Sequence, residues 1–109
     1  MSLTEKLSTL GLTHLENPLS VDDIFEIVNK PEFSKKYDIK KEVLDKEFSI
    51  YGIVFYNIEY PSMKEAEIRF HPLYKKSNDK YYYVDIYSFS LFFNTSNIVK
   101  EIKEKSKEH

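Results

Sequence analysis

Four side chains with catalytic potential alternate along one short stretch of the sequence. Glu65, Glu67, Arg69 and His71 occupy every second position of this stretch. In an extended chain alternate side chains point to the same side, so the spacing predicts one row on a single sheet face. Metal-independent ribonucleases use these groups: a Glu or His takes the 2′-hydroxyl proton, Arg stabilises the charge on phosphorus, and His protonates the leaving group.

Other interpretations of this row compete with catalysis. A solvated strand face with cross-strand ion pairs has the same alternation, and is its commoner cause. A metal site of Glu65, Glu67 and His71 is disfavoured, because side chains two positions apart on a strand start about 6.5–7 Å apart. In the catalytic interpretation, Tyr51 or Tyr83 on an adjacent strand stacks a base.

The sequence lacks the motifs of several large enzyme classes. It has no cysteine, which excludes thiol nucleophiles, disulfides, Cys-rich zinc sites and iron–sulfur clusters. Its two glycines, Gly11 and Gly52, form no phosphate-binding loop, and neither a G-x-S-x-G nor an H-E-x-x-H motif occurs. We therefore expect a protein without metal ligands or cofactors, and one that is not an enzyme unless the row above is catalytic.

The charge balance argues against nucleic acid as a partner, and the lack of a long apolar run argues against a membrane. Sixteen Lys and Arg residues against eighteen Asp and Glu residues give a net charge of −2, and Arg69 is the only arginine. Proteins that neutralise many phosphates are normally basic. No apolar run approaches the roughly 20 residues of a membrane helix. The first residues lack the pattern of a signal peptide. We expect a cytoplasmic protein.

Aromatic residues are the most unusual feature of the composition. Nine Tyr and eight Phe make up 16% of the chain. Tyr and Arg are enriched at binding hot spots, because each combines a large contact area with a polar group. We expect a recognition surface on the sheet face turned away from the helices. Its predicted residues are Tyr51, Phe55, Glu67, Arg69, His71, Tyr83 and Asp85.

Helices are predicted before and after the strands. Ser2 and Glu5 form a capping box for a short helix that ends before Gly11. Ser20 is the expected N-cap of a second helix, which Pro31 stops. One or two short helices are expected from Glu32 to Glu47. The last helix begins after residues 94–96, and its tail is expected to fray after Lys105.

After residue 47 the spacing of apolar residues changes from the helical period of 3.6 to a period of two, which predicts three strands. Residues 48–60 form the first, with even-numbered positions toward the core and Tyr51, Ile53 and Phe55 on the opposite face. Residues 65–71 form the second, with residues 66, 68 and 70 inward. Residues 81–93 form the third, with a bulge near residues 86–87 that reverses its inward face. The phenylalanines placed in the core are Phe48, Phe70, Phe89 and Phe93.

These elements predict a two-layer α+β fold, with short N-terminal helices, a three-stranded antiparallel meander and a C-terminal helix. A chain of 109 residues has the length of a single domain, so residues 1–109 are assigned to one.

Three functions remain open. The preferred one is a non-enzymatic protein that binds and neutralises or modulates a protein partner, as immunity proteins, antitoxins and phage-encoded inhibitors do. Such a partner would be a toxin or nuclease with a basic surface. The first alternative is a metal-independent ribonuclease or ligand-binding enzyme that uses Glu67, Arg69 and His71. The second is a homodimer with no further recognition role.

Overall fold

The computed structural model describes residues 12–108, so the helix expected over residues 2–10 lies outside the described residues. In chain order, the elements are β1 (Leu12–Leu19), α2 (Val21–Val28), α3 (Pro31–Ser34), β2 (Tyr37–Asp45), β3 (Ile50–Asn57), β4 (Lys64–Phe70), the 3₁₀ turn η1 (Pro72–Tyr74), β5 (Tyr81–Ser88) and α4 (Thr95–Glu108).

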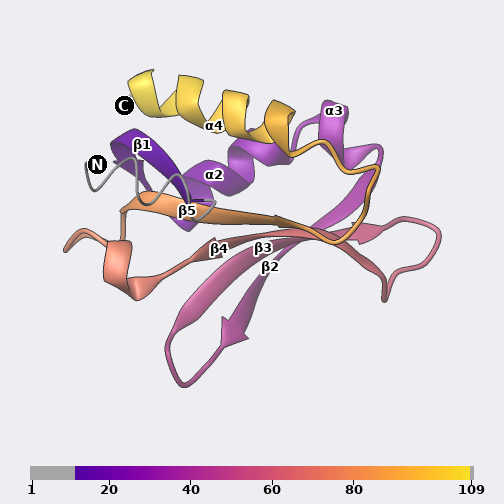
Figure 1. The fold of residues 1–109 in the computed structure, drawn as a ribbon, viewed down its shortest axis with the longest axis horizontal. Coiled ribbons are helices and arrows are strands. Elements are labelled where there is room, and N and C mark those ends of the chain that lie inside the picture. The colour runs from indigo at the N-terminus through magenta and orange to yellow at the C-terminus, as the bar shows by residue number, and fades with distance from the viewer. Residues whose placement is uncertain (1–11, 109) are drawn as a thin grey trace.

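The five strands form one antiparallel sheet in the order β1-β5-β4-β3-β2. The α2, α3 and α4 helices lie on one side of this sheet (Figure 1). The α+β class is therefore confirmed, whereas the three-stranded meander is wrong, because β2 and β1 extend the sheet at its two edges. Among residues 12–108, no helix is both long enough and apolar enough to cross a bilayer.

The β2 strand occupies most of the region from Glu32 to Glu47, in which one or two short helices are expected. Ile39, Val43 and Leu44 have helical spacing, but the chain pairs with β3 along its whole length. Pairing is regular from Tyr37 to Val43, but Lys41 occupies a helix-side position of the strand and interrupts its apolar alternation. Only Pro31–Ser34 of this region is helical, with Pro31 at the first helical position.

The β1 strand was not predicted, because an irregularity hides its period. Leu12, Leu15 and Leu19 are all buried, at spacings of three and four that do not suit a regular strand. The pairing with β5 shifts register between His14 and Leu19. Across this shift β1 has three more residues than β5. Leu15 and Leu19 can therefore both reach the core.

The α2 helix is confirmed with the cap predicted for it. Ser20 accepts a hydrogen bond from the Asp23 backbone N–H at 3.1 Å, and the Asp23 carboxylate accepts one from the Ser20 N–H at 3.0 Å. This is a capping box with Asp at its third position. Ile24, Ile27 and Val28 form its buried stripe.

The α4 helix extends to Glu108, past Lys105, after which its tail is expected to fray. Ser106 is fully buried, and its hydroxyl bonds both backbone groups of Asn17 at 2.8 Å. The Asn17 side-chain amide also donates to the Ser106 carbonyl at 2.8 Å. These contacts hold the last turn of α4 to the irregular part of β1.

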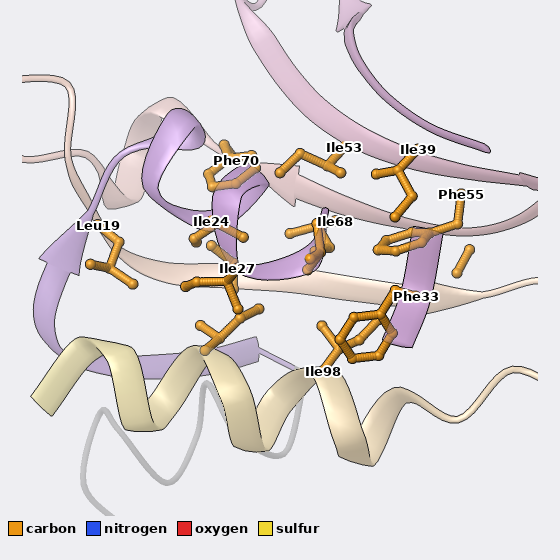
Figure 2. Close-up of a cluster of buried hydrophobic side chains, with 14 of the residues drawn as sticks. Leu19, Ile24, Ile27, Phe33, Ile39, Ile53, Phe55, Ile68, Phe70 and Ile98 are labelled. Atoms are coloured by element: carbon orange, nitrogen blue, oxygen red, sulfur yellow. The ribbon is translucent and has the colours of Figure 1, made fainter. Parts of the chain in front are cut away.

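The core lies between the helix layer and the sheet. Figure 2 shows its side chains from all three helices and from the facing side of the strands. Ala66, Ile68 and Phe70 face this core as predicted. Ile53 and Phe55 also face it, so the inward parity predicted for β3 is wrong. Both parities of β3 are apolar, and the sequence alone does not distinguish them.

The aromatic residues after β5 are exposed because the strand stops. Between Asp85 and Ser88 the pairing with β4 is regular, so the predicted bulge near residues 86–87 is wrong. The chain leaves the sheet after Ser88, and Phe89 is 54% exposed. Phe93 returns to the core as expected, whereas Phe48, in the turn between β2 and β3, is exposed.

Candidate functional site

The candidate site lies on the side of the sheet opposite the helices, called here the helix-free face. The strand register places its residues in rows across the sheet, because directly opposed residues point to the same side. One row contains Val54, Glu67 and Tyr87, and the next contains Gly52, Arg69 and Asp85. The alternation predicted for β4 thus puts Glu67 and Arg69 side by side with β5 residues.

Glu67 and Arg69 form the central ion pair of this face. The Arg69 guanidinium contacts one Glu67 carboxylate oxygen through Nη2 at 2.5 Å and Nε at 2.6 Å. The Glu67 side chain is only 3% exposed, and Lys64 Nζ lies 3.9 Å from its other oxygen. Arg69 also lies over the Tyr87 ring, 4.4 Å from its centre, in a cation–π contact. The guanidinium is therefore held in one orientation by two neighbours.

His71 and Asp85 form a second pair on the same face. Nε2 of His71 lies 2.5 Å from a carboxylate oxygen of Asp85, and Asp85 is buried. The Tyr87 hydroxyl is 3.5 Å from the same oxygen. A carboxylate bonded to one ring nitrogen fixes the orientation of an imidazole. Asp85 therefore positions His71, which stays partly exposed.

An aromatic group continues the face toward β1 and η1. The Tyr83 ring packs against His14, with ring centres 4.9 Å apart, and against Tyr74 at 5.5 Å. Tyr74 in turn lies 6.0 Å from His71 in an edge-on contact. The β1 strand, the η1 turn and the β5 strand thus place three rings next to the His71–Asp85 pair.

The other end of the face is built around Tyr56. Its hydroxyl donates a hydrogen bond to the Glu42 carboxylate on β2, and Lys40 lies over its ring at 5.4 Å. The bond to Glu42 raises the pKa of Tyr56 to about 12, because ionisation would place two negative charges together. This hydroxyl is therefore a donor at all physiological pH values.

Three of the sequence-predicted residues lie elsewhere. Phe55 is fully buried in the core, against Tyr37 and Phe93, and so cannot be part of a recognition surface. Tyr51 pairs with Phe70 and therefore lies on the helix side. Glu65 is the extra residue of a register shift in β4, and it accepts a hydrogen bond from the Asn57 side chain. Of the predicted row, only Glu67, Arg69 and His71 therefore lie together on the helix-free face.

Four residues with aromatic rings on this face were missed by sequence reasoning. Tyr87 lies on the same face as Tyr83 and Asp85, because alternate residues of β5 point to the same side. The bulge predicted at residues 86–87 would have placed it on the other face. Tyr56 was assigned to the core with the even residues of β3. His14 and Tyr74 reach the face through β1 and η1, and no sequence pattern marks that contact.

A separate groove lies on the helix side of the sheet. This open groove of about 440 Å³ is lined by the first turn of α2 and by the β2–β3 hairpin. Tyr51 and Tyr81 line it, and burial raises the pKa of the Tyr81 phenol. Lys41 and Asp22, which are paired at 3.0 Å, close one side.

The described part of the chain, residues 12–108, contains no group of three or more His, Asp or Glu residues arranged to hold a metal ion. Comparison with protein-family models, with curated proteins and with solved structures finds no match to this chain. The chemistry of the helix-free face is therefore interpreted from its own geometry.

Proposed function

We propose that this chain is a non-enzymatic protein-binding module that recognises a protein partner through the helix-free face. The observation that supports this best is the arrangement of Arg69 and Tyr87, which stack on each other while Glu67 holds the guanidinium. Side chains fixed before binding lose less entropy on association than mobile ones do. Tyr and Arg are also the residue types that carry most energy in protein interfaces.

The surrounding groups fit the anatomy of such an interface. His71, Tyr74 and Tyr83 offer ring surfaces beside the Arg69–Tyr87 stack. The charged groups between them are paired within the chain, so a partner can cover them without leaving an isolated charge. This combination of aromatic anchors and satisfied polar groups favours protein as the ligand.

The class of partner rests on composition. A small, mildly acidic chain without recognisable enzyme motifs suits a cytoplasmic inhibitor of the immunity-protein or antitoxin type, acting on a toxin or nuclease with a basic surface.

The ribonuclease alternative is supported less well by the geometry. The His71–Asp85 contact resembles the orientation of a catalytic imidazole. However, the Glu67 carboxylate is nearly buried and bound to Arg69, so the base and the phosphate-binding cation that the reaction needs neutralise each other. A ribonuclease assay with EDTA, comparing the chain with His71→Ala, separates the two functions. Activity that depends on His71 would replace the binding proposal.

Affinity capture tests the binding proposal. The immobilised chain is incubated with lysate of its source cells at physiological salt, beside Tyr87→Ala and the control Lys103→Ala. Lys103 is an exposed residue of α4, and α4 lies on the opposite side of the sheet from Arg69 and Tyr87. We expect a protein retained by the wild type and by Lys103→Ala but not by Tyr87→Ala. Equal retention by all three chains, or by none, would contradict the proposal.

A further inference from the structure

The β2 strand has an edge to which no other strand among residues 12–108 is paired. It is nine residues long, and the hairpin that it forms with β3 curves away from the helix layer (Figure 1). The edge therefore presents alternate backbone N–H and C=O groups that can pair with another strand. We propose that two copies of this chain pair antiparallel through their β2 strands, giving a continuous ten-stranded sheet.

Symmetry limits how two identical edges can pair. Two antiparallel edge strands in one continuous sheet are related by a two-fold axis perpendicular to the sheet. Such an axis passes through a residue position, so one residue of β2 lies opposite its own copy. The strand runs from Tyr37 to Asp45, and only the register centred on Lys41 pairs all of it. In every register about this axis, the helices of both copies lie on the same side of the sheet.

Charge complementarity selects the same register. With Lys41 at the axis, Lys40 of each copy lies opposite Glu42 of the other, and both point to the helix-free face. Moving the axis to Lys40 would place Lys40 opposite itself and Asp38 opposite Glu42. Moving it to Glu42 would place two Glu42 carboxylates together. Opposite charges stabilise a cross-strand pair, whereas like charges destabilise it.

The side chains of β2 that point to the helix side are also compatible with pairing in this register. Ile39 lies opposite Val43 of the other copy, and Val43 is 48% exposed in the single chain, so pairing covers an apolar side chain. Lysines on an edge strand usually prevent pairing. Here the Lys41 ammonium is bound to Asp22 at 3.0 Å and lies over the Phe25 ring at 5.1 Å. The two Lys41 side chains lie opposite each other at the axis, and the charge of each is compensated by Asp22 of its own copy.

Site-directed crosslinking tests the register directly. Because the chain has no cysteine, a single substitution introduces the only thiol. In the proposed dimer the two residues 41 are directly opposite, about 4.5–5.5 Å apart at Cα, within the range that a disulfide spans. The two residues 38 are six positions out of register, roughly 20 Å apart. Under mild oxidation, Lys41→Cys should form a disulfide dimer and Asp38→Cys, equally exposed, should not.

Charge reversal supplies a second, independent readout. Sedimentation velocity over a concentration series should show a dimer for the wild type. Glu42→Lys should weaken it roughly tenfold or more, because two attractive pairs become repulsive. The double variant Lys40→Glu with Glu42→Lys should restore it. A monomer at every concentration, equal crosslinking of the two cysteine variants, or a dimer insensitive to Glu42→Lys would overturn the proposal. Because neither assay involves another protein, these results are independent of partner recognition by the helix-free face.

Discussion

Replacement of Ser106 by Ala should destabilise the fold although it removes a single oxygen. The hydroxyl makes two hydrogen bonds to the backbone of Asn17, both at 2.8 Å, at a position with no solvent exposure. A typical hydrogen bond contributes about 1 kcal/mol net, and a buried group left without a partner costs about 1–3 kcal/mol. Two such groups on Asn17 lose their partner, so we expect a loss of about 2–3 kcal/mol.

Chemical denaturation and thermal melting measure this loss. For a domain of this size, 2 kcal/mol lowers Tm by roughly 8–16 °C. Ser96→Ala is the matched control: the same change at an exposed position of the same helix, with an expected effect within about 0.5 kcal/mol. If the free energy of unfolding of Ser106→Ala lies within about 0.5 kcal/mol of the wild-type value, the last turn of α4 does not hold β1 as described.

Three further predictions concern the sheet. Gly52→Ala should cost about 1–3 kcal/mol in denaturation experiments, because the new Cβ would lie 2.4 Å from Cδ1 of Leu44; unchanged stability would contradict this close packing. Phe55→Ala should cost about 3–5 kcal/mol by the same measurement, since the ring is fully buried, and a cost below about 1 kcal/mol would place it at the surface. The pKa of Tyr56 is about 12 in the fold and about 10 in the unfolded chain, so its contribution to stability is complete below pH 10 and is lost as pH rises to about 12. Denaturation at stepped pH should show a smaller alkaline loss for Tyr56→Phe, and an identical loss would refute the bond to Glu42.

The predictable parts of the fold are those in which local signals agree. The α2 helix has a cap, acidic residues in its first turn and an apolar stripe, and all three indicate the same element. In β4, unbroken alternation around Ile68 fixes which side faces the core. The row Glu67, Arg69, His71 follows from that alternation alone.

The parts that failed depend on contacts between distant segments. In β3, both Ile53 and Val54 are fully buried, so no alternation reveals the inward side. A register shift in β1, and Lys41 at a helix-side position of β2, hide the strand period at the two sheet edges. Pairing with β2 is what brings Glu42 to Tyr56, and pairing of β1 with β5 brings His14 to Tyr83. No local pattern in the sequence encodes either contact.

The affinity of the helix-free face for a captured partner tests the central claim most directly. Once a protein has been retained and purified, its Kd is measured by calorimetry for the wild type, Tyr87→Ala and Lys103→Ala. A hot-spot residue contributes at least about 2 kcal/mol, so Tyr87→Ala should weaken binding roughly 30-fold or more while Lys103→Ala leaves it unchanged. Unchanged affinity for Tyr87→Ala, or a loss confined to Lys103→Ala, would show that recognition does not use the helix-free face.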